Sequence, residues 1–175
     1  MRVLHWVMAI LIVGELTAGL LMVHMYDEVA PIVGDLYPWH KSFGLLILLL
    51  ILGRMVVRWR STVPAFPESL QNWEKVSAHI GHVLLYILIL VVPIMGYCMS
   101  STYTMSDGVT FFGLPVPELL PKNDAQFEVF QLLHRIGAYV LLAVIVVHVL
   151  AVVKHRFFDR SHAGDNDSDV LSRML

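Results

Sequence analysis

Histidine is the residue type in this sequence best suited to chemistry, because a neutral imidazole nitrogen binds metal ions and haem iron. The 175-residue chain contains nine histidines, although 57% of its residues are hydrophobic and only 15% are charged. Ionisable side chains within long apolar stretches are costly and usually mark a functional site. By their positions, four histidines are the first candidates for metal or haem ligation: His5, His40, His134 and His148.

Two of these histidines, His134 and His148, lie fourteen residues apart in the last apolar stretch. On an α-helix this spacing brings them to within about 40° of one another and separates them by about 21 Å along the axis. Haem iron with two axial ligands needs one ligand from each side of the ring, at the same level. His40 begins the second stretch at the level of His134, and His5 begins the first at the level of His148. The spacing therefore predicts two haems, held by His40 with His134 and by His5 with His148.

The binding of these haems is expected to be non-covalent, as in b-type cytochromes. The sequence has no CxxCH motif, and Cys98 is its single cysteine. Two other interpretations remain open. Each histidine alone fits an interfacial side chain whose polar tip reaches water. The histidines and nine methionines together also fit a metal permease, although methionines scattered through apolar stretches are typical of core or lipid-facing packing.

Membrane-spanning helices must position these histidines. A helix needs roughly 20 apolar residues to cross about 30 Å of hydrocarbon. Four stretches reach this length, at residues 3–26, 40–59, 76–99 and 127–153. The sequence thus predicts an all-α integral membrane four-helix bundle over residues 1–160, followed by a polar cytoplasmic tail at 161–175. The long connection at 100–126 is expected to fold back over the periplasmic mouth of the bundle.

Lysine and arginine residues indicate the orientation of the bundle, because they are enriched in cytoplasmic loops. Nine of the twelve basic residues lie on one side of the predicted spans, and the other side has only Lys41, Lys122 and Arg135. Both termini are therefore expected in the cytoplasm. The chain has no basic tract with interleaved aromatic residues, so no nucleic-acid partner is expected.

Five motifs follow one another along the chain: LHW at 4–6, HKSFG at 40–44, AHIGHVLLY at 78–86, LHRIGAY at 133–139 and KHRFFDR at 154–160. As a set they resemble the bacterial cytochrome b561 family, which includes the membrane-bound superoxide oxidase. The resemblance covers about residues 3–160. It implies a four-helix cytochrome of the bacterial inner membrane that holds two haem b groups with the same four histidines and exchanges electrons with ubiquinone.

The resemblance also implies an oxidoreductase with superoxide as a periplasmic electron donor. His155, two turns past His148, is placed to hydrogen-bond a quinone carbonyl, a role that the resemblance supports, and the alternative is an interfacial side chain that reaches water. Seven acidic residues against three basic ones on the periplasmic side would repel an anion such as superoxide unless a local positive patch attracts it. Larger hydrogenase and formate dehydrogenase cytochrome b subunits are relatives, so a membrane anchor and electron conduit for a soluble dehydrogenase is the alternative function.

Three basic side chains are further candidates for haem binding. Arg54 lies fourteen residues after His40, on the same face of the second span but at the cytoplasmic level. It can contact haem propionates there, and the alternative is a simple cytoplasmic anchor. Lys41 and Arg135 each directly follow a periplasmic ligand, where they can bind propionates or attract superoxide.

His79 and His82 lie three residues apart at the cytoplasmic mouth of the third span. Propionate binding or structural hydrogen bonding is the leading interpretation, and the alternative is that one of them replaces His5 or His148 as a ligand. Glu15 lies in the middle of the first span, where a charge is expensive, so we expect it to be protonated, hydrogen-bonded or directed into the bundle. It is also placed to pass protons toward a haem or quinone. Two further histidines receive no role, His24 and His162.

Overall fold

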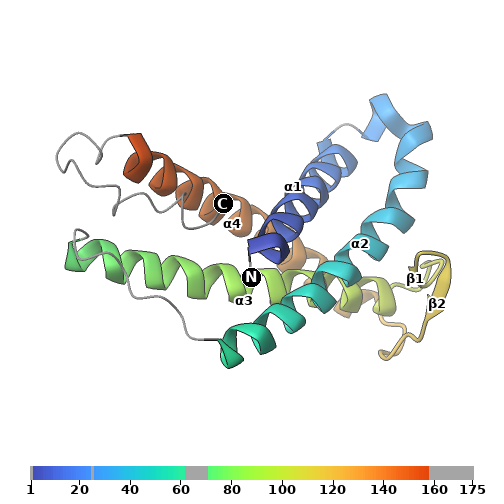
Figure 1. Ribbon diagram of the computed structural model, residues 1–175. Helices are drawn as coiled ribbons and strands as arrows, with labels where there is room; N and C mark the ends of the chain where they lie inside the picture. Colours follow the sequence, from blue (N-terminus) through green and yellow to red (C-terminus); the bar gives the residue numbers. More distant parts are fainter. Residues whose placement is uncertain (1, 25, 62–70, 158–175) are drawn as a thin grey trace.

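Four helices and one short hairpin make up the fold in the computed structural model (Figure 1). The structure describes residues 2–24, 26–61 and 71–157, except for the side chains of 26–35 and 155–157. The elements in chain order are α1 (Arg2–His24), α2 (Tyr26–Arg60), α3 (Asn72–Thr102), β1 (Val109–Phe111), β2 (Leu114–Val116) and α4 (Asp124–Phe157).

Each of the four helices is long and apolar enough to cross a membrane. The candidate spans are Arg2–His24, Leu36–Arg60, Asn72–Thr102 and Asp124–Lys154. Large apolar side chains face outward, as they do where lipid is the solvent; Ile10 is 72% exposed and Val147 is 65% exposed. The predicted all-α, four-helix membrane architecture is therefore confirmed.

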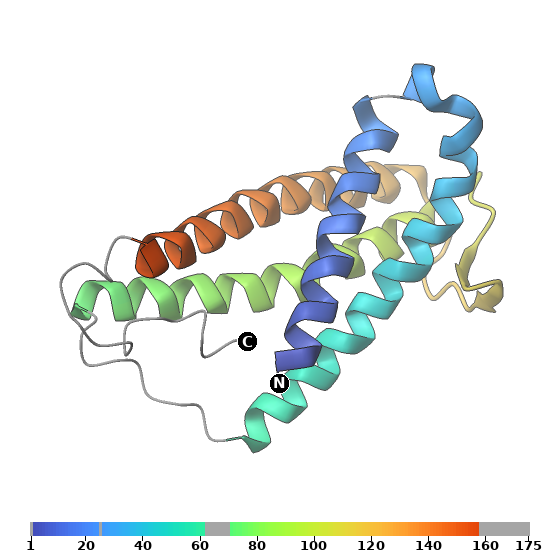
Figure 2. The same cartoon turned by 45° about the horizontal axis from the view of Figure 1, so that its top comes forward.

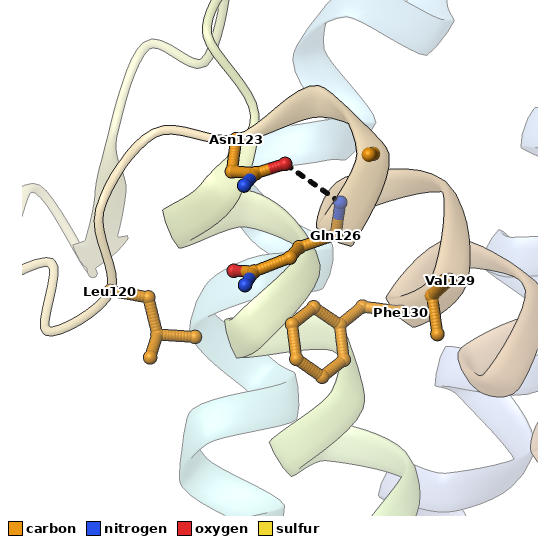
Figure 3. Close-up of a pocket in the computed structure, with 6 residues that line it drawn as sticks. Leu120, Asn123, Gln126, Val129 and Phe130 are labelled. Atoms are coloured by element: carbon orange, nitrogen blue, oxygen red, sulfur yellow. Dashed lines mark hydrogen bonds between the residues drawn. The ribbon is translucent and has the colours of Figure 1, made fainter.

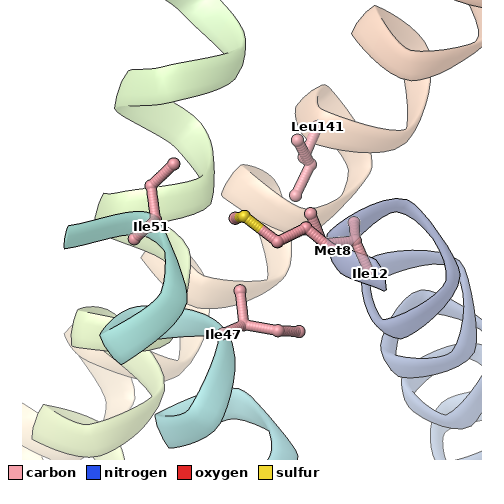
Figure 4. Close-up of a cluster of buried hydrophobic side chains, with 5 residues drawn as sticks. All are labelled: Met8, Ile12, Ile47, Ile51 and Leu141. Atoms are coloured by element: carbon pink, nitrogen blue, oxygen red, sulfur yellow. The ribbon is translucent and has the colours of Figure 1, made fainter. Parts of the chain in front are cut away.

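The helices associate as two pairs that cross obliquely (Figures 1 and 2). α3 and α4 run side by side, and α1 runs alongside α2. An apolar core lies where the pairs meet, built from Met8 and Ile12 of α1, Ile47 and Ile51 of α2, and Leu141 of α4 (Figure 4). This core brings residues from three helices into contact and sets the register of α1 against α2.

α2 begins at Tyr26, whereas the sequence predicted a loop up to His40. Two prolines, Pro31 and Pro38, favoured that loop, because proline lacks the backbone N–H that an interior turn uses. The helix instead bends in this region, and its first turns point away from the rest of α2 (Figure 1). Proline commonly bends a membrane helix without ending it, because neighbouring groups satisfy the freed carbonyls.

The connection between α3 and α4 folds back onto the bundle, as predicted. Its antiparallel hairpin turns at Phe112 and Gly113, which both have positive φ (49° and 85°), the conformation of a tight two-residue turn. Ser42 of α2 anchors the hairpin. Its Oγ lies 3.1 Å from the carbonyl oxygen of Thr110 and accepts a hydrogen bond from the N–H of Phe112 at 3.0 Å. The hairpin therefore covers the part of α2 next to His40.

Candidate functional site at two histidine levels

The first histidine level joins His40 of α2 to His134 of α4. Their ring centres are 6.1 Å apart, and the ring planes are nearly perpendicular, at 89°. Two imidazoles that bind one metal ion from opposite sides have centres about 6 Å apart, since each metal–nitrogen bond is about 2 Å and the ring radius about 1 Å. The spacing of this pair is compatible with two axial ligands of one iron.

The backbone of α3 orients the His134 ring. Nδ1 of His134 donates a hydrogen bond to the carbonyl oxygen of Val92 at 2.9 Å. A carbonyl only accepts, so the proton is on Nδ1 and Nε2 keeps its lone pair, the form that binds a metal. Gly96 of α3 leaves room for the ring, because a Cβ built at this position would lie 3.0 Å from Cε1 of His134.

The His40 ring faces a carboxylate. Nδ1 of His40 lies 2.7 Å from Oε2 of Glu15, and the two side chains are only 22% and 15% exposed. This nitrogen is buried, and within the described part of the chain it makes no aligned hydrogen bond. The two atoms are therefore close enough for an ion pair, but they lack hydrogen-bond geometry. Glu15 is thus directed into the bundle, one of the three outcomes expected for it, and its neighbour is a candidate haem ligand.

The second level contains three histidines from three helices. The ring centres of His82 (α3) and His148 (α4) are 5.5 Å apart, with ring planes at 69°. His5 of α1 lies within electrostatic range of both. The structure therefore brings the predicted pair, His5 and His148, to the same region as the alternative ligand His82.

Arg54 of α2 completes this second level. Its guanidinium contacts Nδ1 of His5 at 3.1 Å, and its Nε donates a hydrogen bond to the hydroxyl of Tyr86 at 3.2 Å. Arg54 and Arg58 both lie over the Tyr86 ring, 5.8 and 5.6 Å from its centre. A guanidinium only donates, so Nδ1 of His5 accepts here and the ring proton is on Nε2. In this arrangement His5 has no free Nε2 lone pair, and Arg54 must leave His5 before Nε2 binds a metal.

Several predicted residues lie away from the histidine rings. Nζ of Lys41 donates a hydrogen bond to the carbonyl oxygen of Gly108 at 2.8 Å, so its ammonium holds the hairpin connection. Arg135 and His79 are exposed on α4 and α3. The side chain of His155 is outside the described residues, as is the whole of His162.

Three contacts at the site were not anticipated from the sequence. Tyr86 lies in the AHIGHVLLY motif, but no sequence pattern marks its hydroxyl as a partner of Arg54, and none marks Gly96 or the carbonyl of Val92 as neighbours of His134. A backbone carbonyl gives no residue-type signal, and a glycine that makes room for a ring is recognisable only once the facing helix is known. His24, which received no role, lies 2.8 Å from the Tyr139 hydroxyl through its Nε2.

A pocket of about 420 Å³ opens at the start of α4 (Figure 3). It is lined by Leu120, Asn123, Ala125, Gln126, Val129 and Phe130. The side chain of Asn123 accepts a hydrogen bond from the N–H of Gln126 at 3.1 Å, which caps the first turn of α4. None of the histidines lines this pocket, so it is separate from both levels.

Comparisons with known proteins identify the family of this chain. A family model for prokaryotic cytochrome b561 matches residues 1–164. The cytochrome b561 homolog 2 of Escherichia coli (strain K12) is 31% identical over 176 residues, which cover 98% of this chain and 86% of that protein. A probable superoxide oxidase CybB of Yersinia pestis is 28% identical over 128 residues, 69% of each chain. The cytochrome b561 homolog 1 of E. coli is 21% identical over 70% of this chain and 69% of its own length.

The match to the family model spans nearly the whole chain, including all four helices. The chain therefore belongs to the prokaryotic cytochrome b561 family, and it is a multi-pass membrane cytochrome that binds b-type haem and works in electron transfer.

Proposed function

We propose that this protein is a diheme cytochrome of the bacterial inner membrane that transfers electrons from a periplasmic donor to ubiquinone. The observation that carries the proposal is the presence of two histidine levels, each with imidazoles from facing helices. When bound, a b-type haem at each level supplies one-electron redox chemistry, while the protein supplies ligation, spacing and electrostatics.

His40 and His134 are the proposed axial ligands of the first haem. Their ring spacing of 6.1 Å and the Nδ1 contact of His134 with the Val92 carbonyl support this assignment. The hydrogen bond to the carbonyl orients the ring and makes Nε2 a stronger ligand. The hairpin anchored on Ser42 packs against α2 two residues from His40.

His5 and His148 are the proposed ligands of the second haem, and His82 is the alternative partner of His148. Arg54 lies against His5, where it is placed to bind a haem propionate through two parallel N–H donors. Tyr86 and Arg58 support the guanidinium from its other side. A propionate that draws Arg54 away from His5 would release Nδ1 for protonation and leave Nε2 available to the iron.

Superoxide is the proposed donor, because the Y. pestis relative is named a probable superoxide oxidase. Oxidation of superoxide to dioxygen releases one electron, so two superoxide ions and two protons reduce one ubiquinone to ubiquinol. Lys41 and Arg135 are the basic side chains next to the first pair of ligands, and they are proposed to attract the anion locally. His155, on α4 beyond His148, is proposed to hydrogen-bond the quinone at the cytoplasmic face.

A reduced-minus-oxidised absorption spectrum of the purified protein, with haem measured per chain, tests the cofactor assignment. We expect two haems per chain in the wild type and one in each of His40→Ala and His134→Ala. A pulse of superoxide in the presence of ubiquinone then tests the substrates, with ubiquinol formation above the uncatalysed rate as the expected result. A loaded protein that forms no ubiquinol but co-purifies with a stoichiometric soluble dehydrogenase would instead support the electron-conduit function.

A further inference from the structure

Glu15 is a carboxylate in the middle of a membrane span, where a charge is expensive unless it has a specific partner. Its Oε2 lies 2.7 Å from Nδ1 of His40, and its side chain is only 15% exposed. Gly44, one turn after His40 on α2, lies beside this carboxylate, since a Cβ built there would be in van der Waals contact with Oε2 at 4.0 Å. The helices thus accommodate a carboxylate directly behind a proposed haem ligand.

The buried Nδ1 of His40 makes no aligned hydrogen bond within the described residues, and the Glu15 carboxylate is its neighbour at 2.7 Å. Burying a polar nitrogen without a partner is destabilising. A proton on Nδ1 beside this carboxylate pairs the two groups electrostatically and leaves Nε2 with its lone pair. Metal-binding histidines commonly donate their second N–H to a carboxylate in this way, which fixes the ring and increases its basicity.

We propose that Glu15 is a positioning residue for His40 that also stabilises the ferric state of the haem held by His40 and His134. The inference rests on the proposed function, because it requires a haem at this level. Ferric haem carries one more positive charge at the iron than ferrous haem, so a nearby anion favours the oxidised form. Glu15 therefore lowers the reduction potential of this haem.

The opposite charge lies at the other level. His5 contacts the guanidinium of Arg54, and Arg58 is close by on the same Tyr86 ring. A cation near a haem favours the ferrous form, which raises its reduction potential. Glu15 and His5 are ten residues apart on α1, about 15 Å of helical rise, so distance makes each charge act mainly on its own level. This asymmetry drives electrons from the His40–His134 haem to the His148 haem.

Potentiometric titration of Glu15→Gln tests the inference, with the haem content and visible spectrum of each level followed separately. His134→Ala and His148→Ala identify which spectral component belongs to which level. We expect Glu15→Gln to keep two haems and to shift the ferric–ferrous equilibrium of the His40–His134 haem at least tenfold toward ferrous, a rise of about 59 mV for one electron. The potential of the second haem should stay at its wild-type value.

Glu128→Gln is the matched control, because Glu128 is an exposed acid on α4. It removes the same charge and should leave both potentials unchanged. A fully loaded Glu15→Gln protein with an unmoved potential would overturn the inference while leaving the diheme assignment intact. If Glu15→Gln loses the haem, Glu15→Asp, which keeps the carboxylate, is the second test. A Glu15→Asp protein that binds both haems and has the wild-type potential supports the inference. Loss of the haem from both variants contradicts it. If substitution of His40 removes no haem from the protein, both the inference and the proposed function are overturned.

Discussion

Nδ1 of His134 donates a hydrogen bond across the α3–α4 interface to the carbonyl oxygen of Val92, 2.9 Å away. Val92 is 8% exposed, so this carbonyl is held in a packed part of α3. The contact means that α3, which provides no ligand at this level, controls the direction of a ring on α4. Changes in α3 should therefore affect haem binding at the proposed His40–His134 site.

Gly96→Ala should weaken haem binding at the His40–His134 level. The new Cβ would lie 3.0 Å from Cε1 and 3.1 Å from Nδ1 of the His134 ring, so the ring must move. Overpacking of this kind costs about 1–3 kcal/mol, which corresponds to roughly tenfold or more in affinity. The loss of affinity is measured as the amount of haem that stays bound per chain after dilution, or after mixing with an apo-protein that accepts haem. Gly81→Ala on the same helix has open space around its Cβ and should retain both haems.

The ligand of the second haem can be assigned by comparing three single variants. We expect His5→Ala to lose this haem and His82→Ala to keep it, with His79→Ala as an exposed control on the same helix as His82. The visible spectrum and haem content of each purified variant give the result. If His82→Ala loses the haem and His5→Ala keeps it, the ring contact of 5.5 Å between His82 and His148 identifies the true pair.

Arg54→Gln should lower the reduction potential of the second haem. The substitution removes a cation that contacts His5 and leaves the Tyr86 hydroxyl without its guanidinium partner. A nearby cation disfavours ferric haem, which carries one more positive charge than ferrous haem, so its removal lowers the reduction potential. Redox titration measures the shift, and Arg60→Gln, at the exposed end of α2, is the control. A potential that rises in Arg54→Gln would show that Arg54 does not act as a cation toward this haem.

Ser42→Ala should loosen the hairpin over the first level without unfolding the helices. Ser42 is 2% exposed, and its hydroxyl contacts the carbonyl of Thr110 and the N–H of Phe112. Removing a buried hydrogen-bonding group of this kind costs about 1–3 kcal/mol. Faster proteolysis within residues 103–123 is the expected readout. Ser61→Ala removes an exposed hydroxyl that donates a hydrogen bond to the carbonyl oxygen of Val57, away from the hairpin, and this variant should be cut at the wild-type rate.

The membrane helices could be predicted from sequence because their length and hydropathy are local properties. The pairing of His40 with His134 could be predicted as well, since the constant rise along a helix puts both at one level. Other lateral neighbours could not, because they depend on which helix faces pack together. Glu15 illustrates the difference: its buried, bundle-facing position was expected from the cost of a charge, whereas His40 as its neighbour required the crossing of α1 and α2.

The beginning of α2 was mispredicted for a related reason. Pro31 and Pro38 lack the N–H that a helix interior uses, so the local sequence favoured a loop. The observed helix continues from Tyr26 through a bend. At the second level, His82 contacts His148 and Arg54 contacts His5, and spacing along the chain gives no means of choosing between His5 and His82 as the partner of His148.

The layer of Met8, Ile12, Ile47 and Ile51 separates the Glu15–His40 contact from the His5–Arg54 contact. None of these four side chains can take up or release a proton. Proton relays through membrane proteins need chains of acidic side chains, histidines or water molecules, and none of these four side chains can act as a link in such a chain. Electrons cross hydrocarbon by tunnelling and need none. Under the proposed diheme function, the same four residues would let charge pass as electrons while resisting a proton leak that would dissipate the membrane potential.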